Sequence, residues 1–86
     1  MNNDTLDPVA VGRVIFRYRK WRRLSQEVLS GLADIGRTHL SAIERGERRP
    51  TLDTLYKLSK ALGVNMSDIV YEIEREIDNA DKRARR

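Results

Sequence analysis

Residues 24–46 read LSQEVLSGLADIGRTHLSAIERG, and this stretch decides how the chain folds. Leu29 and Ala33 recur at the i, i+4 spacing of one helix face, and Leu40 and Ile43 recur at i, i+3 further along. Between the two pairs, Asp34 tolerates the left-handed backbone of a tight turn, and the apolar Ile35 is expected to point inward. The stretch therefore predicts two short helices joined by a turn, which is a helix-turn-helix.

The second of these helices has an outward face of small or hydrogen-bonding residues, namely Arg37, Thr38, Ser41 and Ala42. Such a face suits the major groove of DNA, because arginine can bind guanine O6 and N7 and a methyl group can pack on thymine. Arg37 is the first candidate for base reading, since a cation in the first turn opposes the helix dipole and a broken local rule at an exposed site indicates function. The alternative is a solvated arginine that reaches a phosphate.

Helix signals continue on both sides of this stretch. Asp7-Pro8 is a cap followed by proline at the first helical position, and it predicts a helix to about Arg22. Thr51 caps a helix that ends at Gly63, and Asn65 opens a last, extended helix. No strand pattern, repeat or linker is present. The sequence predicts an all-α, compact five-helix bundle, with residues 8–64 as the DNA-binding domain and residues 65–86 as a C-terminal helix and basic tail.

The bulk composition excludes several classes of protein. A chain of 86 residues has room for one small domain. It has no cysteine and one histidine, so we expect no disulfide, no metal and no other cofactor or small-molecule ligand. No apolar run approaches the about 20 residues of a membrane span, and Met1-Asn2-Asn3-Asp4 lacks a signal peptide, so we expect a cytoplasmic protein. No nucleophile with a base is evident, so we expect no enzyme activity.

The chain has a net charge of +4, and its charged residues are unevenly distributed along the sequence. Residues 13–23 hold six basic side chains and no acid, whereas residues 68–81 hold six acids against Arg75 alone. We expect the first segment to face phosphates and the second not to. The simpler interpretation of the basic run is a solvated helix face.

Several segments resemble the Xre family of phage-repressor-like and Cro-like transcription factors. They lie at consistent spacing across residues 13–70 and are Leu24–Glu27, Ile35, Leu40–Gly46, Pro50–Leu55 and Lys60–Val64. The resemblance implies a lambda-repressor-like fold and a dimeric, sequence-specific DNA-binding protein. It maps the helix that enters the groove onto Gly36–Arg45, with base contacts from Arg37, Thr38, Ser41 and Ala42.

The resemblance also implies contacts to the DNA backbone. Gln26 begins the first helix of the motif, where its amide and free backbone N–H groups can hold a phosphate. Arg45, Arg48 and Arg49 flank the end of the second helix and are expected to clamp the backbone without specifying sequence. His39 either touches the backbone or acts as a spacer against the preceding helix.

The family pattern further pairs Arg19 with Glu44 in a partly buried structural ion pair. This chain departs from the pattern at Asp34, where glycine is usual, and at Gly36, where a serine cap is usual. It also has Phe16 where a polar residue is common. Because they lie on a helix, the aromatic residues of this segment are expected to serve the core or an interface; they are Phe16, Tyr18 and Trp21.

The last helix carries a heptad seam, with spacings of 4, 3, 4, 3 and 4 between its apolar positions from Met66 to Ala84. The seam predicts packing against a twin helix in a homodimer through Met66, Val70, Ile73, Ile77 and Ala80. Its first half, with Ile69, can instead complete the core of the same subunit, and the acids of residues 72–78 are expected on the outside. The alternative is a helix that frays after Ile77 into the tail of residues 81–86.

These features together predict a transcriptional regulator that binds a palindromic double-stranded DNA operator as a homodimer and represses by occluding RNA polymerase. The length and the run Arg37-Thr38-His39-Leu40-Ser41 place restriction-modification controller proteins as the nearest subgroup. The alternative is an antitoxin or other protein-interaction module that acts through the acidic C-terminal helix and binds DNA secondarily.

Overall fold

The computed structural model describes residues 5–84 of the chain, so the expectations for Met1-Asn2-Asn3-Asp4 and for Arg85 and Arg86 of the basic tail lie outside the described residues. Within residues 5–84 there are five helices and no strand, which confirms the all-α prediction. The helices are α1 (Pro8–Trp21), α2 (Gln26–Ala33), α3 (Arg37–Glu44), α4 (Leu52–Leu62) and α5 (Met66–Ala84). Because α5 stays helical past Ile77, the fraying alternative is wrong.

The helices begin where the sequence places caps. The side chains of Asp7, Ser25 and Thr51 each accept a hydrogen bond from a backbone N–H two or three residues further on, at 2.9, 3.0 and 3.1 Å. These bonds satisfy N–H groups that have no partner within the helix. The start of α3 differs from these three, because its cap residue Gly36 has no side chain to accept such a bond.

Two turns position α3 between α2 and α4. Asp34 ends α2 in the left-handed conformation, with φ of 56° and ψ of 48°, as expected for this substitute for glycine. Gly46 follows α3 with φ of 78°, and a Cβ added there would lie 3.0 Å from Cγ2 of Val9. A residue other than glycine would therefore be disfavoured at position 46 by both backbone conformation and space.

One hydrophobic core joins all five helices. Its fully buried members include the side chains expected from the helix-turn-helix pattern, and Ile35 packs against them from the turn. The buried core residues are Val11, Val14, Ile15, Leu29, Ala33, Leu40, Ile43, Leu55, Leu58, Leu62, Ile69 and Ile73. The last two come from α5, so the first half of α5 completes the core of its own chain.

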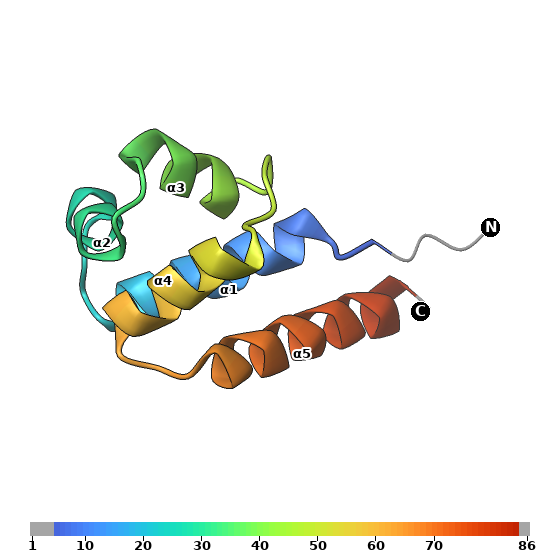
Figure 1. Cartoon of the computed structure of the whole chain (residues 1–86). Coiled ribbons are helices and arrows are strands. Elements are labelled where there is room, and N and C mark those ends of the chain that lie inside the picture. Colours follow the sequence, from blue (N-terminus) through green and yellow to red (C-terminus); the bar gives the residue numbers. More distant parts are fainter. Residues whose placement is uncertain (1–4, 85–86) are drawn as a thin grey trace.

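The arrangement places α3 and α5 on opposite sides of α1 and α4 (Figure 1). On one side, α1 approaches the end of α3 so closely that a Cβ added at Gly12 would lie 2.4 Å from the carbonyl oxygen of Ile43. On the other side, α1 packs along α5. The α3 helix is thus held at the edge of the bundle, away from the C-terminal helix.

Two of the three aromatic residues of α1 do not lie in the core of the single chain. Phe16 is 44% exposed and Trp21 is 67% exposed, because the inward face of α1 is already occupied by Ile15 and Arg19. Only Tyr18 packs against the core, and its ring meets that of Trp21 edge-on at 6.3 Å between centroids. Of the two expected roles, core or interface, the core role therefore does not apply to Phe16 and Trp21, and the interface role stays a prediction.

The basic and acidic segments meet rather than occupying separate surfaces. Glu76 of α5 accepts hydrogen bonds from Arg13 at 3.2 Å and Arg17 at 2.8 Å, and its side chain is only 12% exposed. The expected outward position of this acid is wrong, because α5 packs along α1 and brings Glu76 between the two arginines. Part of the basic run is thereby neutralised within the chain.

Candidate nucleic-acid interface

The α3 helix has two distinct faces. Its inner face contributes Leu40 and Ile43, both 0% exposed, to the core. Its outer face carries the predicted base-reading residues: Arg37 and Thr38 are exposed, and Ser41 and Ala42 are half-buried one turn further on. The spacing of these four residues places them on one face of α3, opposite the buried Leu40 and Ile43. Because Gly36 provides no side-chain cap, the first N–H groups of α3 also have no side-chain partner there.

A hollow runs beside α3 and is lined from both the helix and the loop that follows it. Its lining residues are Thr38, His39, Ala42, Arg45, Glu47 and Arg48. His39, which the sequence left between a backbone contact and a spacer, is half-buried and lines this hollow. Arg48 is exposed at the same place. The hollow therefore gathers three of the residues expected at the DNA backbone.

Arg45 is already engaged within the chain. Its guanidinium donates to the carboxylate of Glu47 at 2.9 and 3.0 Å, and its Nη1 donates to Oγ of Ser41. The hydrogen bonds between the two charged groups raise the pKa of Arg45 and lower the pKa of Glu47. Sequence reasoning missed Glu47, although an acid two residues after a DNA-facing arginine was the available signal. An intramolecular carboxylate thus already holds one of the arginines that the sequence assigned to the DNA backbone.

Arg49 is also held within the chain, because its Nε donates to the carbonyl oxygen of Leu6 at 2.8 Å. This bond ties the segment before α1 to the loop after α3. Of the three arginines expected to clamp the backbone, Arg48 makes no hydrogen bond or ion pair among the described residues.

A buried ion pair supports α3 from behind. Arg19 donates to both carboxylate oxygens of Glu44, at 2.7 and 2.9 Å, and to the carbonyl oxygen of Leu24. The hydrogen bond to Glu44 raises the pKa of Arg19. The amide of Gln26, expected at a phosphate, instead donates to Glu44 at 2.9 Å, which leaves its carbonyl oxygen and the first N–H groups of α2 for other partners.

A basic cleft lies at the start of α2. It is lined by Arg19, Lys20, Arg23, Leu24, Ser25 and Gln26. Arg23 adopts a left-handed backbone with φ of 58° in the turn between α1 and α2. The basic run pointed to this region, but Lys20 and Arg23 were not singled out from it. The cleft places exposed cations beside a helix N-terminus, which is a favourable setting for an anion.

The residues expected in a dimer seam separate into two groups. Ile73 is 3% exposed within the single chain and has no surface left for a partner, and Met66 and Ile77 pack against the core. Val70 is 42% exposed, and Ala80 is half-buried. The physical reason is that an amphipathic helix packed on its own bundle shows nearly the same apolar spacing as a coiled coil.

The described residues contain neither a cluster of metal-ligating side chains nor a helix that could span a membrane. Within residues 5–84, no group of three or more metal-ligating side chains of the His, Cys, Asp and Glu types is gathered in one place. None of the helices in the described part of the chain combines the length and apolar character that crossing a membrane requires.

The model of the helix-turn-helix family (HTH_3) matches residues 15–69. The chain belongs to the helix-turn-helix family. This helix-turn-helix protein is 36% identical to control protein C.MunI of Mycoplasma sp over 69 residues, which cover 79% of this chain and 93% of the relative. It is 41% identical to the immunity repressor protein of Bacillus phage phi105 over 64 residues, which cover 74% of this chain and 44% of the repressor.

A solved structure extends the likeness to the fold of most of this helix-turn-helix protein. The restriction-modification controller protein C.Esp1396I, as a tetramer in complex with its natural 35 base-pair operator, aligns with a TM-score of 0.76 and 28% identity. The alignment covers 86% of this chain and 97% of the controller protein. Fold and relatives together confirm the resemblance to phage-repressor-like proteins and place the chain among the helix-turn-helix transcription regulators and restriction-modification controllers.

Proposed function

We propose that this chain binds a palindromic DNA operator as a homodimer, with α3 in the major groove, and regulates transcription as a repressor or autoregulator of the controller type. The observation that carries the proposal is the division of α3 into a buried inner face and an uncovered outer face. Leu40 and Ile43 hold the helix on the bundle, while Arg37 and Thr38 remain exposed at its start. An exposed helix with such side chains at its N-terminal end fits the docking geometry of helix-turn-helix proteins.

Base reading is assigned to the outer face of α3. Arg37 has the donors for a bidentate contact to guanine, and the methyl groups of Thr38 and Ala42 can contact thymine. Ser41 accepts a hydrogen bond from Arg45, so its own hydroxyl hydrogen remains available to a base acceptor.

Backbone contacts are assigned to the two basic regions around α3. Gln26 offers its side-chain carbonyl and the N-terminus of α2, with Lys20 and Arg23 beside it in the same cleft. Arg48 and His39 lie in the hollow along α3, where Arg45 joins them once it exchanges Glu47 for a phosphate. Arg49 contacts DNA only if it leaves the carbonyl of Leu6. These groups would set the position of α3 on the duplex without specifying sequence.

Dimerisation is assigned to an apolar groove between the start of α4 and the first half of α5. The groove is lined by Leu6, Val11, Arg49, Pro50, Thr51, Leu52, Leu55, Met66, Val70 and Ile73. Leu52 at its edge is 70% exposed, Leu6 is 47% exposed and Val70 is 42% exposed. In a two-fold dimer the same patch of both copies meets itself, so the protruding Leu52 of each copy could enter the apolar groove of the other. Of the predicted seam, Met66, Val70 and the buried Ile73 line this groove, while Ile77 and Ala80 lie outside it.

The same groove connects dimerisation to DNA binding. The segment from Arg45 to Thr51 leaves α3, and its last residues line the groove. A second copy seated there would bring its own α3 to a two-fold related position. Half-sites read by such a dimer are expected about 34 Å apart along the duplex.

Selection of bound sequences from a random DNA pool tests the proposal. We expect one enriched motif with two inverted half-sites, and an affinity for it that falls steeply as salt concentration rises. The smallest protein–DNA complex that forms should contain two chains per operator, as measured by sedimentation. Enrichment of no motif, or of a single unrepeated half-site bound by one chain, would contradict the proposal.

A further inference from the structure

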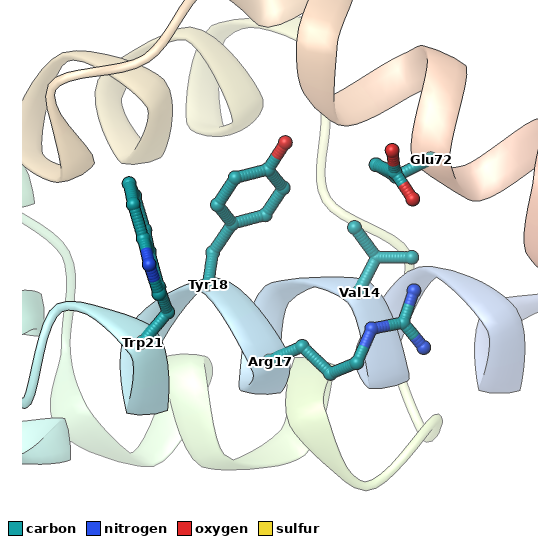
Figure 2. Close-up of a pocket in the computed structure, with 5 residues that line it drawn as sticks. All are labelled: Val14, Arg17, Tyr18, Trp21 and Glu72. Carbon is teal, nitrogen blue, oxygen red and sulfur yellow. The ribbon is translucent and has the colours of Figure 1, made fainter.

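A pocket lies between α1 and α5, on the opposite side of α1 from α3 (Figure 1). It is lined by Val14, Arg17, Tyr18 and Trp21 of α1 and by Glu72 of α5. Figure 2 shows the rings of Tyr18 and Trp21 standing side by side on α1 and projecting toward α5, while Glu72 projects from α5 back toward α1. Trp21, the single tryptophan of the chain, is 67% exposed. None of the DNA contacts assigned above uses this pocket.

The aromatic residues of the chain divide by whether they already hold a cation. Phe16 has Arg19 and Lys20 over its ring at 5.3 and 5.8 Å, and Tyr56 and Tyr71 each have a basic side chain of the next helical turn at 5.7 and 6.0 Å. Among the described residues, Tyr18 and Trp21 have no such partner. The two aromatic rings without a cation are therefore the two that line the pocket.

The charges around the pocket favour a cation as its occupant. Glu72 makes no hydrogen bond among the described residues, and its ion pair with Arg75 is long, at 4.0 Å between Oε2 and Nη1. Arg17 also lines the pocket, but its Nη1 lies 2.8 Å from Glu76 and is engaged there. Burial and the negative charges of Glu72 and Asp68 raise the pKa of Tyr18, with Arg17 opposing them more weakly.

We propose that this pocket binds an arginine side chain presented by a basic segment of a partner protein. The guanidinium would stack against Tyr18 and Trp21 and pair with Glu72, while the apolar part of its side chain would contact Val14. Arginine fits better than lysine because its planar group can stack on an aromatic face and still donate to a carboxylate. A further exposed acid of α5, Asp78, would attract the rest of the segment. Since α3 lies on the opposite side of α1, the partner and DNA could be bound together (Figure 1).

Fluorescence of Trp21 in the full-length chain gives a direct test, with an arginine-glycine hexapeptide of alternating residues as the probe. We expect a saturable change in emission below about 1 mM peptide. The matched peptide with citrulline in place of arginine keeps the shape and removes the charge, and it should bind at least about fivefold more weakly, as a cation–π contact with a paired carboxylate predicts. Equal binding of the two peptides, or no binding at these concentrations, would overturn the proposal.

Paired variants separate the pocket from the general charge of α5. Glu72→Gln should weaken peptide binding about fivefold or more, whereas Glu74→Gln removes the same charge outside the pocket and should change it less than about twofold. Trp21→Leu, followed by anisotropy of a labelled peptide, should weaken binding similarly to Glu72→Gln. Circular dichroism melts of all three variants control for folding. An equal effect of Glu72→Gln and Glu74→Gln would show that the peptide reads net charge alone, and the pocket would be rejected.

Discussion

Arg19 and Glu44 form a two-pronged ion pair, with Nε 2.7 Å from Oε2 and Nη2 2.9 Å from Oε1. Their side chains are 10% and 5% exposed, and Gln26 donates to the same carboxylate. The pair joins α1 to the last residue of α3, and Gln26 adds the first residue of α2. Three helices therefore meet at one carboxylate, and this contact determines where α3 stands relative to the bundle.

Removal of Glu44 should destabilise the chain strongly. In Glu44→Ala the guanidinium of Arg19 stays largely buried without its partner, so we expect a loss of about 3–5 kcal/mol in the free energy of unfolding. Gln26→Ala removes one neighbouring hydrogen bond and should cost only about 1 kcal/mol. Urea unfolding followed by circular dichroism measures both. A Glu44→Ala midpoint equal to that of the wild type would refute the structural role of the pair.

Arg37→Ala should reduce both affinity and sequence preference. If Arg37 reads a guanine, the change costs about 1–3 kcal/mol of binding and relaxes the preference at one position of each half-site. Arg48→Ala is the matched control, since Arg48 is an exposed arginine assigned to the backbone. It should weaken binding to all sequences alike. Repeating the selection from a random pool with both variants distinguishes the roles, and a uniform loss for Arg37→Ala would assign it to a phosphate.

Glu47→Gln should strengthen binding to DNA of any sequence. The carboxylate that holds Arg45 at 2.9 and 3.0 Å is removed, so the arginine becomes free for a phosphate. We expect the slope of log affinity against log salt to become steeper by about 1, the value for one added phosphate contact. Glu74→Gln changes the net charge equally at a distance from α3 and serves as the control. Identical slopes for the two variants would argue against competition at Arg45.

Acid should weaken the attachment of α5 to α1 through Glu76. Hydrogen bonds from Arg17 and Arg13 lower the pKa of Glu76 in the folded chain, against the opposing effect of burial. The unfolded chain then binds more protons over the interval between the two values, so this contribution to stability is fully present above the ordinary glutamate pKa of about 4.3 and is lost as the pH falls through the lower folded value. Urea unfolding as a function of pH should show a smaller acid-induced decrease in Glu76→Gln than in Glu74→Gln.

Leu52→Glu should dissociate the proposed dimer without unfolding the chain. Leu52 is 70% exposed in the single chain, so a charged side chain costs little there until a second copy approaches. Leu32→Glu is the control, because Leu32 is 62% exposed on α2 and does not line the groove. Sedimentation velocity should find monomers for Leu52→Glu and dimers for Leu32→Glu. Dimers in both variants would place the interface elsewhere.

Much of the fold follows from local chemistry. Caps at Asp7, Ser25 and Thr51 determine where helices begin, and Asp34 provides the left-handed turn, because each of these effects depends on a side chain and the few residues next to it. The inward positions of Leu40 and Ile43 follow equally from helix periodicity. A single sequence is sufficient for such features.

The engagement of the charged residues could not be predicted in the same way. Glu76 meets Arg13 and Arg17 across 63 and 59 positions of sequence, and no local pattern links them. Ile73 and Val70 have the same apolar character, yet one is buried and the other is exposed, because α5 presents one face to α1 and α4 and the other to solvent. For the site, the outer face of α3 was predictable, whereas the pairing of Arg45 with Glu47 depended on rotamers in a loop.

The close approach of α1 to α3 at Gly12 also bears on how new DNA specificities arise. A Cβ there would lie 2.4 Å from the carbonyl oxygen of Ile43 and 2.7 Å from that of Glu44, so the distance between the two helices depends on main-chain atoms. Main-chain atoms are the same whatever side chains α3 displays outward. Substitution of the outward residues of α3, by mutation or by grafting from another regulator, therefore leaves the position of α3 against α1 unchanged. These are the residues at positions 37, 38, 41 and 42. Variation at Gly12 has no such freedom, since any larger residue would shift α3 and its whole outer face relative to α1.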